Sequence, residues 1–429
     1  MMLSALILSL AAAQDPGTPE LRGAWLANDT VDTAPHRADM LAKLKRGHFN
    51  TVFIAVPPLN GQYGTSDPAG FGAMVDDCKG AGLSVHAWFS CFKRQGETSQ
   101  ADFTSAAEQQ AQKQWFLDML AAYPKLDGVQ CDYIRYSTWE ACIAAKMKGV
   151  ADTVKAIREA VAPRPLTCAV FNAASISYRG WKPTWEGDVP QWYRDWYAAH
   201  PGNYYEQQAN APGNNPNWLL GGSFFSYQQD PAAWIKAGIA DGCAAMQYTA
   251  VDATWQNEVQ VWKSFLGTDN ARLYMDLGWM GPAPFFEDSA FDPAAMDRFI
   301  KYGRANGVKG FVVFRLGQPG VDDSPFLDAL SVDGPANGNA APFTKDVAST
   351  LAGSSGGPAP VPPAPPPSGA APSAPGGGGG GHHACGGSVG ARVSPFEPLV
   401  LAAAILLALA TSRRASSCIA GAGGRSRGT

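Results

Sequence analysis

The sequence predicts a (β/α)8 TIM barrel, an α/β fold in which eight parallel strands close into a ring and helices cover the outside. Strand and helix signals alternate between residues 20 and 343, as expected for βαβ units and a parallel sheet. Eight strand signals follow one another, and a span of about 320 residues suits one barrel domain. An open, doubly wound sheet is the alternative that the same alternation allows.

The expected strands are short runs of apolar and β-branched residues, with helical spacing of apolar residues between them. They are Arg22–Leu26, Thr51–Val56, Ser84–Phe89, Gly128–Cys131, Leu166–Phe171, Cys243–Thr249, Arg272–Leu277 and Gly310–Phe314. The spacing breaks after the fifth strand, where a connection of roughly sixty residues is typical of a functional loop. Its tryptophans are Trp181, Trp185, Trp192, Trp196 and Trp218. Because this aromatic insertion follows a strand, we expect it to wall a cleft on the active-site face.

Residues 1–13 predict a signal peptide and therefore export. The apolar run Leu3–Leu10 precedes three alanines, which form a small-residue cleavage site. No Lys or Arg precedes this run, and a buried first helix is the alternative. The barrel domain is expected over residues 20–343. Residues 344–384 are rich in Pro, Gly and Ala, which predicts a disordered linker.

Residues 385–414 predict a sorting or anchor segment with a short apolar helix, and residues 415–429 a tail. The segment combines Cys385, the apolar run Leu399–Ala410 and the pair Arg413-Arg414. The run is short for a membrane-spanning helix, which needs about 20 residues. In this combination the segment resembles the C-terminal sorting tags of some Gram-negative bacteria, including the myxobacterial type. The resemblance implies processing near Cys385 and attachment at the cell envelope or surface, and a single-pass membrane anchor is the alternative.

Composition argues against several classes of partner and cofactor. The net charge is −4 and no basic face stands out, so nucleic acid is not an expected partner. The eight cysteines show no disulfide framework and no CxxC pair, so we expect small buried side chains, with Cys78–Cys91 as the one pairing to test. No serine-hydrolase, Walker A or dinucleotide motif occurs, and His86 has no second ligand at metal spacing, so neither cofactor nor catalytic metal is expected.

The sharpest candidate for chemistry is Asp132, at the end of the fourth expected strand. Side chains alternate along a strand, so Gln130 and Asp132 face the barrel interior while Val129 and Cys131 face the helices. Barrel enzymes place their working groups at this end of the strands. Arg135 lies three residues on and should keep Asp132 ionised, which suits a nucleophile or a cation stabiliser. A buried structural Asp–Arg pair is the alternative from spacing alone.

Gly128–Tyr136 resembles the G-[IV]-x-x-D-Y-[IV]-R-Y signature of the glycosyl-hydrolase-like family 10 barrels, the DUF187 group. Further segments resemble that family in the same order: Glu20–Leu26, Gly47–Val52, Val85–Trp88, Trp234–Thr249 and Gly307–Phe314. The resemblance implies a TIM barrel that hydrolyses a glycan, with cell-wall amino-sugar strands as one class. Ser137 and Phe89-Ser90 depart from the family pattern, which puts the substrate in doubt more than the fold.

A glycosidase generally needs a second carboxyl group that can protonate the leaving oxygen. We favour Asp252 after the sixth strand, by analogy with related barrels that pair carboxylates after strands four and six. A solvated loop Asp is the alternative. Asp276 on the seventh strand favours a structural role, and Glu186 and Asp188 lie in the aromatic insertion.

Other strand ends carry rings that can stack on sugars and polar groups that can bind hydroxyls. The expected substrate-binding residues are Trp25, Asn28, His86, Trp88, Arg135, Asn172, Tyr248, Asp276, Trp279 and Arg315. The sequence thus predicts an exported glycosidase, with an inactive surface-displayed glycan-binding barrel as the main alternative. A third possibility is another chemistry on the same fold, such as an esterase or a lyase.

Overall fold

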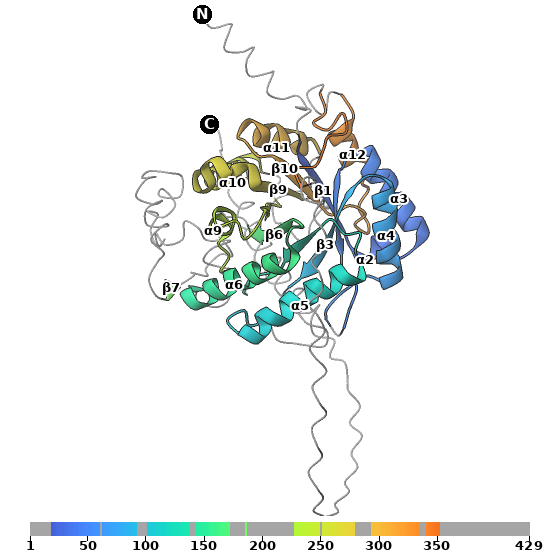
Figure 1. The fold of residues 1–429 in the computed structure, drawn as a ribbon. Coiled ribbons are helices and arrows are strands. Elements are labelled where there is room, and N and C mark those ends of the chain that lie inside the picture. Colours follow the sequence, from blue (N-terminus) through green and yellow to red (C-terminus); the bar gives the residue numbers. More distant parts are fainter. Residues whose placement is uncertain are drawn as a thin grey trace, which may run out of the picture. The chain divides into compact units, whose positions relative to one another are not determined.

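The chain folds into a closed barrel of parallel strands, in the order β1-β10-β9-β8-β6-β4-β3-β2 (Figure 1). The computed structural model describes residues 19–60, 62–91, 101–136, 142–171, 185–186, 227–248, 251–278, 293–334 and 340–351. The first strand pairs with both the second and the last, which closes the ring and excludes the open sheet. The predicted (β/α)8 fold is therefore confirmed.

The barrel strands match the predicted runs closely. They are β1 (Leu21–Leu26), β2 (Thr51–Ala55), β3 (Ser84–Ser90), β4 (Gly128–Asp132), β6 (Leu166–Phe171), β8 (Gly242–Met246), β9 (Leu273–Gly278) and β10 (Gly310–Phe314). The largest difference is in β8, which ends at Met246, so that Tyr248 belongs to the loop. A two-stranded pair outside the barrel joins β5 (Cys142–Ile143) to β7 (Trp185–Glu186).

Helices surround the strands as Figure 1 shows. They are α2 (Asn28–Val31), α3 (Ala34–Arg46), α4 (Pro68–Gly80), α5 (Ala106–Ala122), α6 (Ala144–Val161), α9 (Pro231–Lys236), α10 (Asp252–Leu266), the 3-10 helix η3 (Gly267–Arg272), α11 (Pro293–Ala305) and α12 (Ser324–Ser331). Local sequence sets their starts. Asp67 and Asp230 each accept a hydrogen bond from an N–H of the first turn, and a proline follows each in that turn. These caps satisfy N–H groups that have no partner within the helix.

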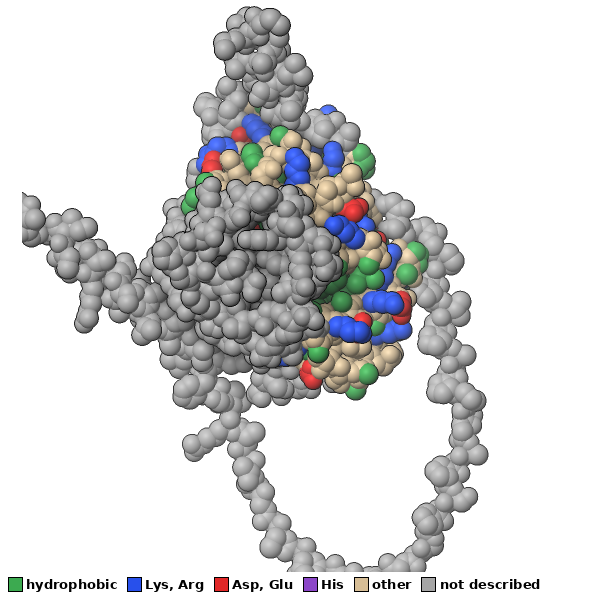
Figure 2. Space-filling model, turned by 90° about the vertical axis from the view of Figure 1, so that its left-hand side faces the viewer, with side chains coloured by type: hydrophobic (Ala, Val, Ile, Leu, Met, Phe, Trp, Pro, Cys, Tyr) green, Lys and Arg blue, Asp and Glu red, His purple; other side chains and the backbone are tan. Residues whose placement is uncertain are grey.

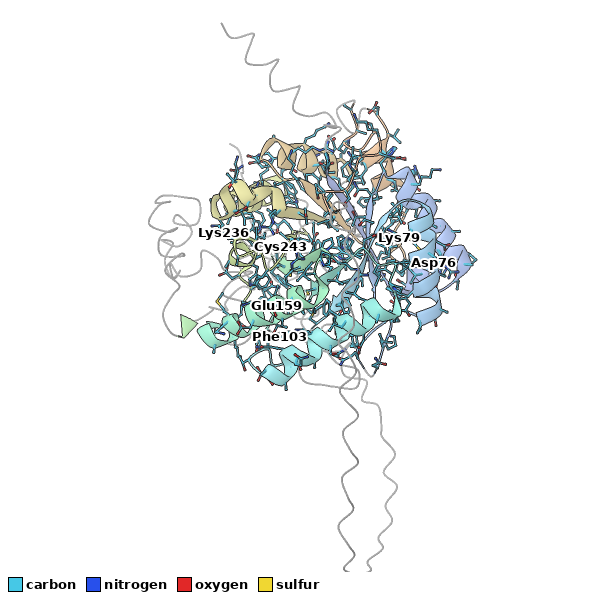
Figure 3. The ribbon with its side chains drawn as sticks, in the orientation of Figure 1. Asp76, Lys79, Phe103, Glu159, Lys236 and Cys243 are labelled. Atoms are coloured by element: carbon cyan, nitrogen blue, oxygen red, sulfur yellow. The ribbon has the colours of Figure 1, made fainter. Side chains whose placement is uncertain are left out.

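Strand alternation separates an aromatic interior from an apolar outer layer. Trp25, Phe53 and Val312 pack inside the barrel. Cys131 and Cys168 pair in register on β4 and β6, and belong to the buried layer between strands and helices, as does Cys243 on β8 (Figure 3). Cys78, Cys91, Cys131, Cys168 and Cys243 are free and buried, so the Cys78–Cys91 pairing suggested for testing is not formed.

Residues 343–351 form a segment, the C-terminal strap, that packs on the N-terminal ends of the strands. Phe343 is 1% exposed, and Leu351 belongs to the interior cluster of the barrel. Glu20 N donates to Ala348 O at 3.0 Å, and Asn50 Nδ2 donates to Val347 O at 3.0 Å. Barrel packing therefore continues past residue 344, where we expected the linker to begin.

Several predicted features lie outside the described residues. These are the signal peptide, most of the linker, the anchor segment, the tail and all of the aromatic insertion except 185–186 and 227–230. Within the part of the chain that the structure describes, no helix is long and apolar enough to cross a membrane. On the face shown in Figure 2, Lys and Arg side chains are interspersed with Asp and Glu.

Candidate functional site

The candidate site is built around Asp132, the last residue of β4. Alternation turns its side chain into the barrel, where it is 5% exposed. Its Oδ2 accepts a hydrogen bond from Trp88 Nε1 at 3.0 Å, and its Oδ1 accepts one from the backbone N–H of Tyr133 at 2.6 Å. Arg135 Nη1 lies 3.4 Å from the same Oδ1. The carboxylate therefore lies at the mouth with three donors around it, as the sequence predicted for its position.

The start of β4 is fixed by a different carboxylate. Lys79 of α4 donates to Asp127 at 2.7 Å, and Asp127 Oδ2 accepts the backbone N–H of Val85 at 2.7 Å. Figure 3 shows Lys79 on its helix beside the barrel. Next to it, a side chain on Gly128 would place a Cβ 2.5 Å from the His86 ring. The Asp-Gly pair at the start of the motif thus holds strand position, while Asp132 at its end faces the site.

The environment of Asp132 changes one electrostatic expectation. Burial raises the pKa of the Asp132 carboxyl, and this outweighs the charge of Arg135 and the hydrogen bonds from Tyr133 N and Trp88, which act to lower it. The sequence shows that Arg135 is near Asp132, but it does not show how far the carboxyl is removed from water. Asp132 therefore binds a proton more readily than a surface carboxylate does.

A second carboxyl group, Asp276, lies inside the barrel on β9. It pairs in register with Val312 and shares the inward face of its strand with Tyr274. Its side chain is fully buried, and neither carboxyl oxygen has a hydrogen-bond partner among the described residues. Burial raises its pKa well above the ordinary value, and the negative charge of Asp132 raises it further.

A buried carboxyl without a hydrogen-bond partner destabilises the folded state when it is ionised, because it loses its hydration and forms no hydrogen bond in exchange. A purely structural Asp would be expected to have a partner. The sequence favoured a structural role for Asp276, and the orphaned oxygens argue against it. Strand alternation from Tyr274 could have placed Asp276 inward, but no sequence pattern reports the absence of a donor.

Aromatic rings line the space around the two carboxyls. Trp88 and Tyr248 are partly exposed, and Tyr248 stacks on Phe314 with ring centroids 5.3 Å apart. The Trp25 ring lies 6.0 Å from Trp88, but it is 1% exposed and its Nε1 donates to Gln130 Oε1. Of the tryptophans expected to bind sugars, Trp88 is therefore placed to touch a ligand, and Trp25 supports it from below.

Arg135 is held by rings as much as by Asp132. Its guanidinium carbon lies 4.1 Å from the centroid of Tyr133 and 4.6 Å from that of Phe171. Phe171 in turn stacks on Tyr227 at 3.5 Å. Such cation–π contacts fix a guanidinium that is only 8% exposed. Arg135 thus carries a fixed positive charge beside the carboxylate.

His86 lies on β3, below Trp88 on the same inward face of the strand. Its side chain is fully buried on β3, between Phe53 and the space beside Gly128, and Ser84 Oγ lies 3.1 Å from its Nε2. Burial lowers its pKa to about 4. Its side chain has no exposed surface in this conformation, and its role in sugar binding stays a prediction.

Asp252 and Arg315, two other expected site residues, form ion pairs with residues other than Asp132 and Asp276. Asp252, the first residue of α10, forms a two-point ion pair with Arg298 of α11 at 2.8 and 3.0 Å, and its side chain is 38% exposed. Arg315 forms a similar pair with Asp29 at 2.5 and 2.9 Å, next to Asn28 on α2. The partner that the structure gives Asp252 is thus Arg298, and its role as the second carboxyl stays a prediction. Asn172 and Trp279 lie outside the described residues. Within the described ranges, no group of His, Cys, Asp or Glu could hold a metal ion.

No protein-family model matches the sequence, and no curated protein matches it, so the resemblance to glycosyl-hydrolase-like family 10 stays a prediction. The fold is similar to solved barrels of glycoside hydrolases. A chitinase from Rhizomucor miehei is 14% identical with a TM-score of 0.44, over 72% of this chain and 98% of that one. The spore cortex-lytic enzyme SleL of Bacillus cereus is 10% identical with a TM-score of 0.46, over 70% and 72%. An endo-1,4-β-D-mannanase from Thermotoga petrophila is 11% identical with a TM-score of 0.48, over 72% and 97%. At such low identity the likeness concerns the fold alone.

Proposed function

We propose that the protein is a glycoside hydrolase that uses Asp132 and Asp276 as its carboxyl pair. The observation that carries the proposal is the contrast between their environments. Asp132 has three donors around its oxygens, whereas Asp276 has none in the described part of the chain. Two interacting carboxyls in unlike surroundings separate into one that ionises and one that keeps its proton. Glycoside hydrolysis needs such a pair.

The two environments support a different role for each carboxyl. Asp132 carries the negative charge of the pair, because the N–H groups of Trp88 and Tyr133 and the guanidinium of Arg135 stabilise it. It acts on the sugar as nucleophile, base or cation stabiliser. Asp276 keeps the proton and delivers it to the leaving oxygen. Trp88 and Tyr248 offer rings for the apolar faces of the sugar.

The test is turnover of a panel of polysaccharides and cell-wall glycans by wild type and variants. Asp132→Asn and Asp276→Asn nearly preserve shape, and each should lower turnover by about 10²–10⁴-fold, the range for loss of an acid–base group. Asp76→Asn is the matched control, since Asp76 pairs with Lys125 on the surface and is 59% exposed (Figure 3). Full turnover in either site variant, on a substrate that wild type cleaves, would remove that residue from the reaction.

One observation favours a second candidate, a glycan-binding barrel without turnover. Asp276 is fully enclosed, so its oxygens have no exposed surface through which to protonate a substrate in this conformation. A binding barrel would retain glycans and cleave none of them. Binding in Asp132→Asn and in wild type would then be alike, with no product from either.

We also propose that the protein is exported and held at the cell envelope or surface. This rests on the sequence of residues 1–13 and 385–414 alone. The tail would contact the membrane, and a sorting protease would process it near Cys385. Fractionation of native host cells tests this proposal. A protein found in the cytoplasm would refute both the export and the attachment at the envelope.

A further inference from the structure

Tyr133, directly after Asp132, has an unusual backbone conformation for a large residue. Its φ is 53°, in the left-handed region that side chains other than Gly, Asn and Asp rarely adopt. The side chain is 41% exposed, which makes it one of few large apolar residues on the surface of the described chain. A large ring is thus kept in a strained turn at the edge of the candidate site.

The turn itself does not require a ring. It is closed by backbone groups: Tyr133 N donates to Asp132 Oδ1 at 2.6 Å, and Arg135 N donates to Tyr133 O at 2.8 Å. Asparagine or glycine would make both bonds and would tolerate a positive φ. Strained residues of this kind persist where the surrounding structure holds them, and they cluster at active and ligand-binding sites.

The ring is nevertheless fixed in place. The guanidinium of Arg135 lies 4.1 Å from its centroid, and the same guanidinium rests on Phe171 at 4.6 Å. Arg135 is 8% exposed, so the guanidinium that holds the Tyr133 ring in place is itself buried. A fixed, partly exposed ring beside a catalytic carboxylate has the properties of a sugar-stacking surface.

The two sides of Asp132 differ in exposure. Asp276, on the inner side, is fully enclosed, whereas Tyr133 is exposed to solvent. If Asp132 and Asp276 act as a pair, the sugar that reacts lies between them, on the side of Asp132 away from Tyr133. A ring that stacks on Tyr133 therefore belongs to the next sugar of the chain.

We propose that Tyr133 is a specificity-determining residue that stacks on the sugar adjacent to the one attacked at Asp132, and so selects oligosaccharides over single sugars. This inference rests on the proposed function in one respect: it takes the bond cleaved to lie at Asp132. It predicts that the ring contributes to binding of an oligosaccharide and contributes little to the chemical step.

The experiment compares Tyr133→Phe, which keeps the ring, with Tyr133→Asn, which removes it and suits the positive φ. For an oligosaccharide that wild type cleaves, Tyr133→Asn should raise KM about tenfold, the scale of one lost aromatic contact, and should leave kcat within about twofold. Tyr133→Phe should keep both constants near wild type. The melting temperature of Tyr133→Asn should equal or exceed that of wild type, because the strain is relieved.

Three results would overturn the inference. An unchanged KM in Tyr133→Asn, with turnover intact, would remove the stacking role and leave the proposed function standing. A lower melting temperature in Tyr133→Asn would show that the ring stabilises the turn. If wild type cleaves no glycan, the proposed function fails, and calorimetric titration with the same oligosaccharides takes over as the test. Binding about tenfold weaker in Tyr133→Asn would then support the stacking role, and equal or absent binding would refute it.

Discussion

The C-terminal strap should stabilise the barrel from its closed end, and Phe343→Ala tests this most directly. Phe343 is 1% exposed, and its ring lies 4.4 Å from the Arg22 guanidinium and 5.6 Å from that of Arg304. Both arginines form buried ion pairs with Glu20, at 3.0 and 2.6 Å. The ring therefore covers a charged cluster whose energy depends on exclusion of water.

The magnitude follows from burial. Replacement of a buried Phe by Ala typically costs about 3–5 kcal/mol, from lost transfer energy and the cavity that remains. Leu351, 6% exposed in the interior cluster, should cost about 2–5 kcal/mol on replacement by Ala. For a domain of this size, about 3–5 kcal/mol corresponds to a fall in melting temperature of roughly 5–15 °C. A chain cut after Pro342 loses both side chains and should be destabilised more than either variant.

The assay is thermal and urea unfolding of chains that end at Pro342 and at Leu351, with the two point variants. Asp346→Ala is the matched control within the strap, since the Asp346 side chain is 91% exposed and pairs with His48 on the surface. Such a pair contributes under about 1 kcal/mol. Equal melting temperatures for the two truncated chains would refute the reasoning and return the domain boundary to residue 343.

Three further predictions concern single residues. Because the folded pKa of Asp276 is raised far above its unfolded value of about 3.9, its stabilising contribution is full below about pH 4 and is lost as pH rises through the folded pKa. Asp276→Asn should therefore make the free energy of unfolding, measured with urea, depend less on pH in that range. Identical pH curves for the variant and wild type would contradict this prediction. Asp252→Asn breaks an exposed pair with Arg298 and should cost under about 1 kcal/mol with turnover unchanged; a loss of several orders of magnitude would restore Asp252 as the second carboxyl. Gly128→Ala forces a Cβ to within 2.5 Å of the His86 ring and should cost about 1–3 kcal/mol in unfolding free energy, whereas an unchanged melting temperature would show that His86 can move.

The sequence was sufficient for the barrel because two periodic signals agree at every strand. Apolar runs of strand length alternate with helical spacing, and inward and outward residues alternate within each run. Asp132 could be placed at the mouth by the same count along β4. The exact extent of the domain could not, because the strap has no regular secondary structure and its two anchors, Phe343 and Leu351, are single apolar residues in a polar stretch.

The second carboxyl that we propose, Asp276, was harder to predict for a physical reason. Asp252 and Asp276 both lie at or after expected strands, and composition does not distinguish them. What separates them is their partners: Arg298 reaches Asp252 from α11, while no described group reaches Asp276. Such partners come from elements far apart in sequence, and only the closed barrel brings them together or keeps them away.

Arg135 in the motif did not predict the direction in which the pKa of Asp132 shifts. Arg135 does lie beside it, but at 3.4 Å, and its guanidinium is shared with the rings of Tyr133 and Phe171. Burial acts on the carboxyl at the same time and in the opposite direction. The net effect leaves Asp132 with a raised pKa beside a neighbour, Asp276, whose pKa is raised further. The two carboxyls of such a pair titrate together. A pH–rate profile would therefore give apparent pKa values that belong to the pair and not to either residue. Because Arg135 lowers the pKa of the Asp132 carboxyl, replacing Arg135 by Gln should move that profile to higher pH, and an unmoved profile would contradict a role for Asp132 in turnover.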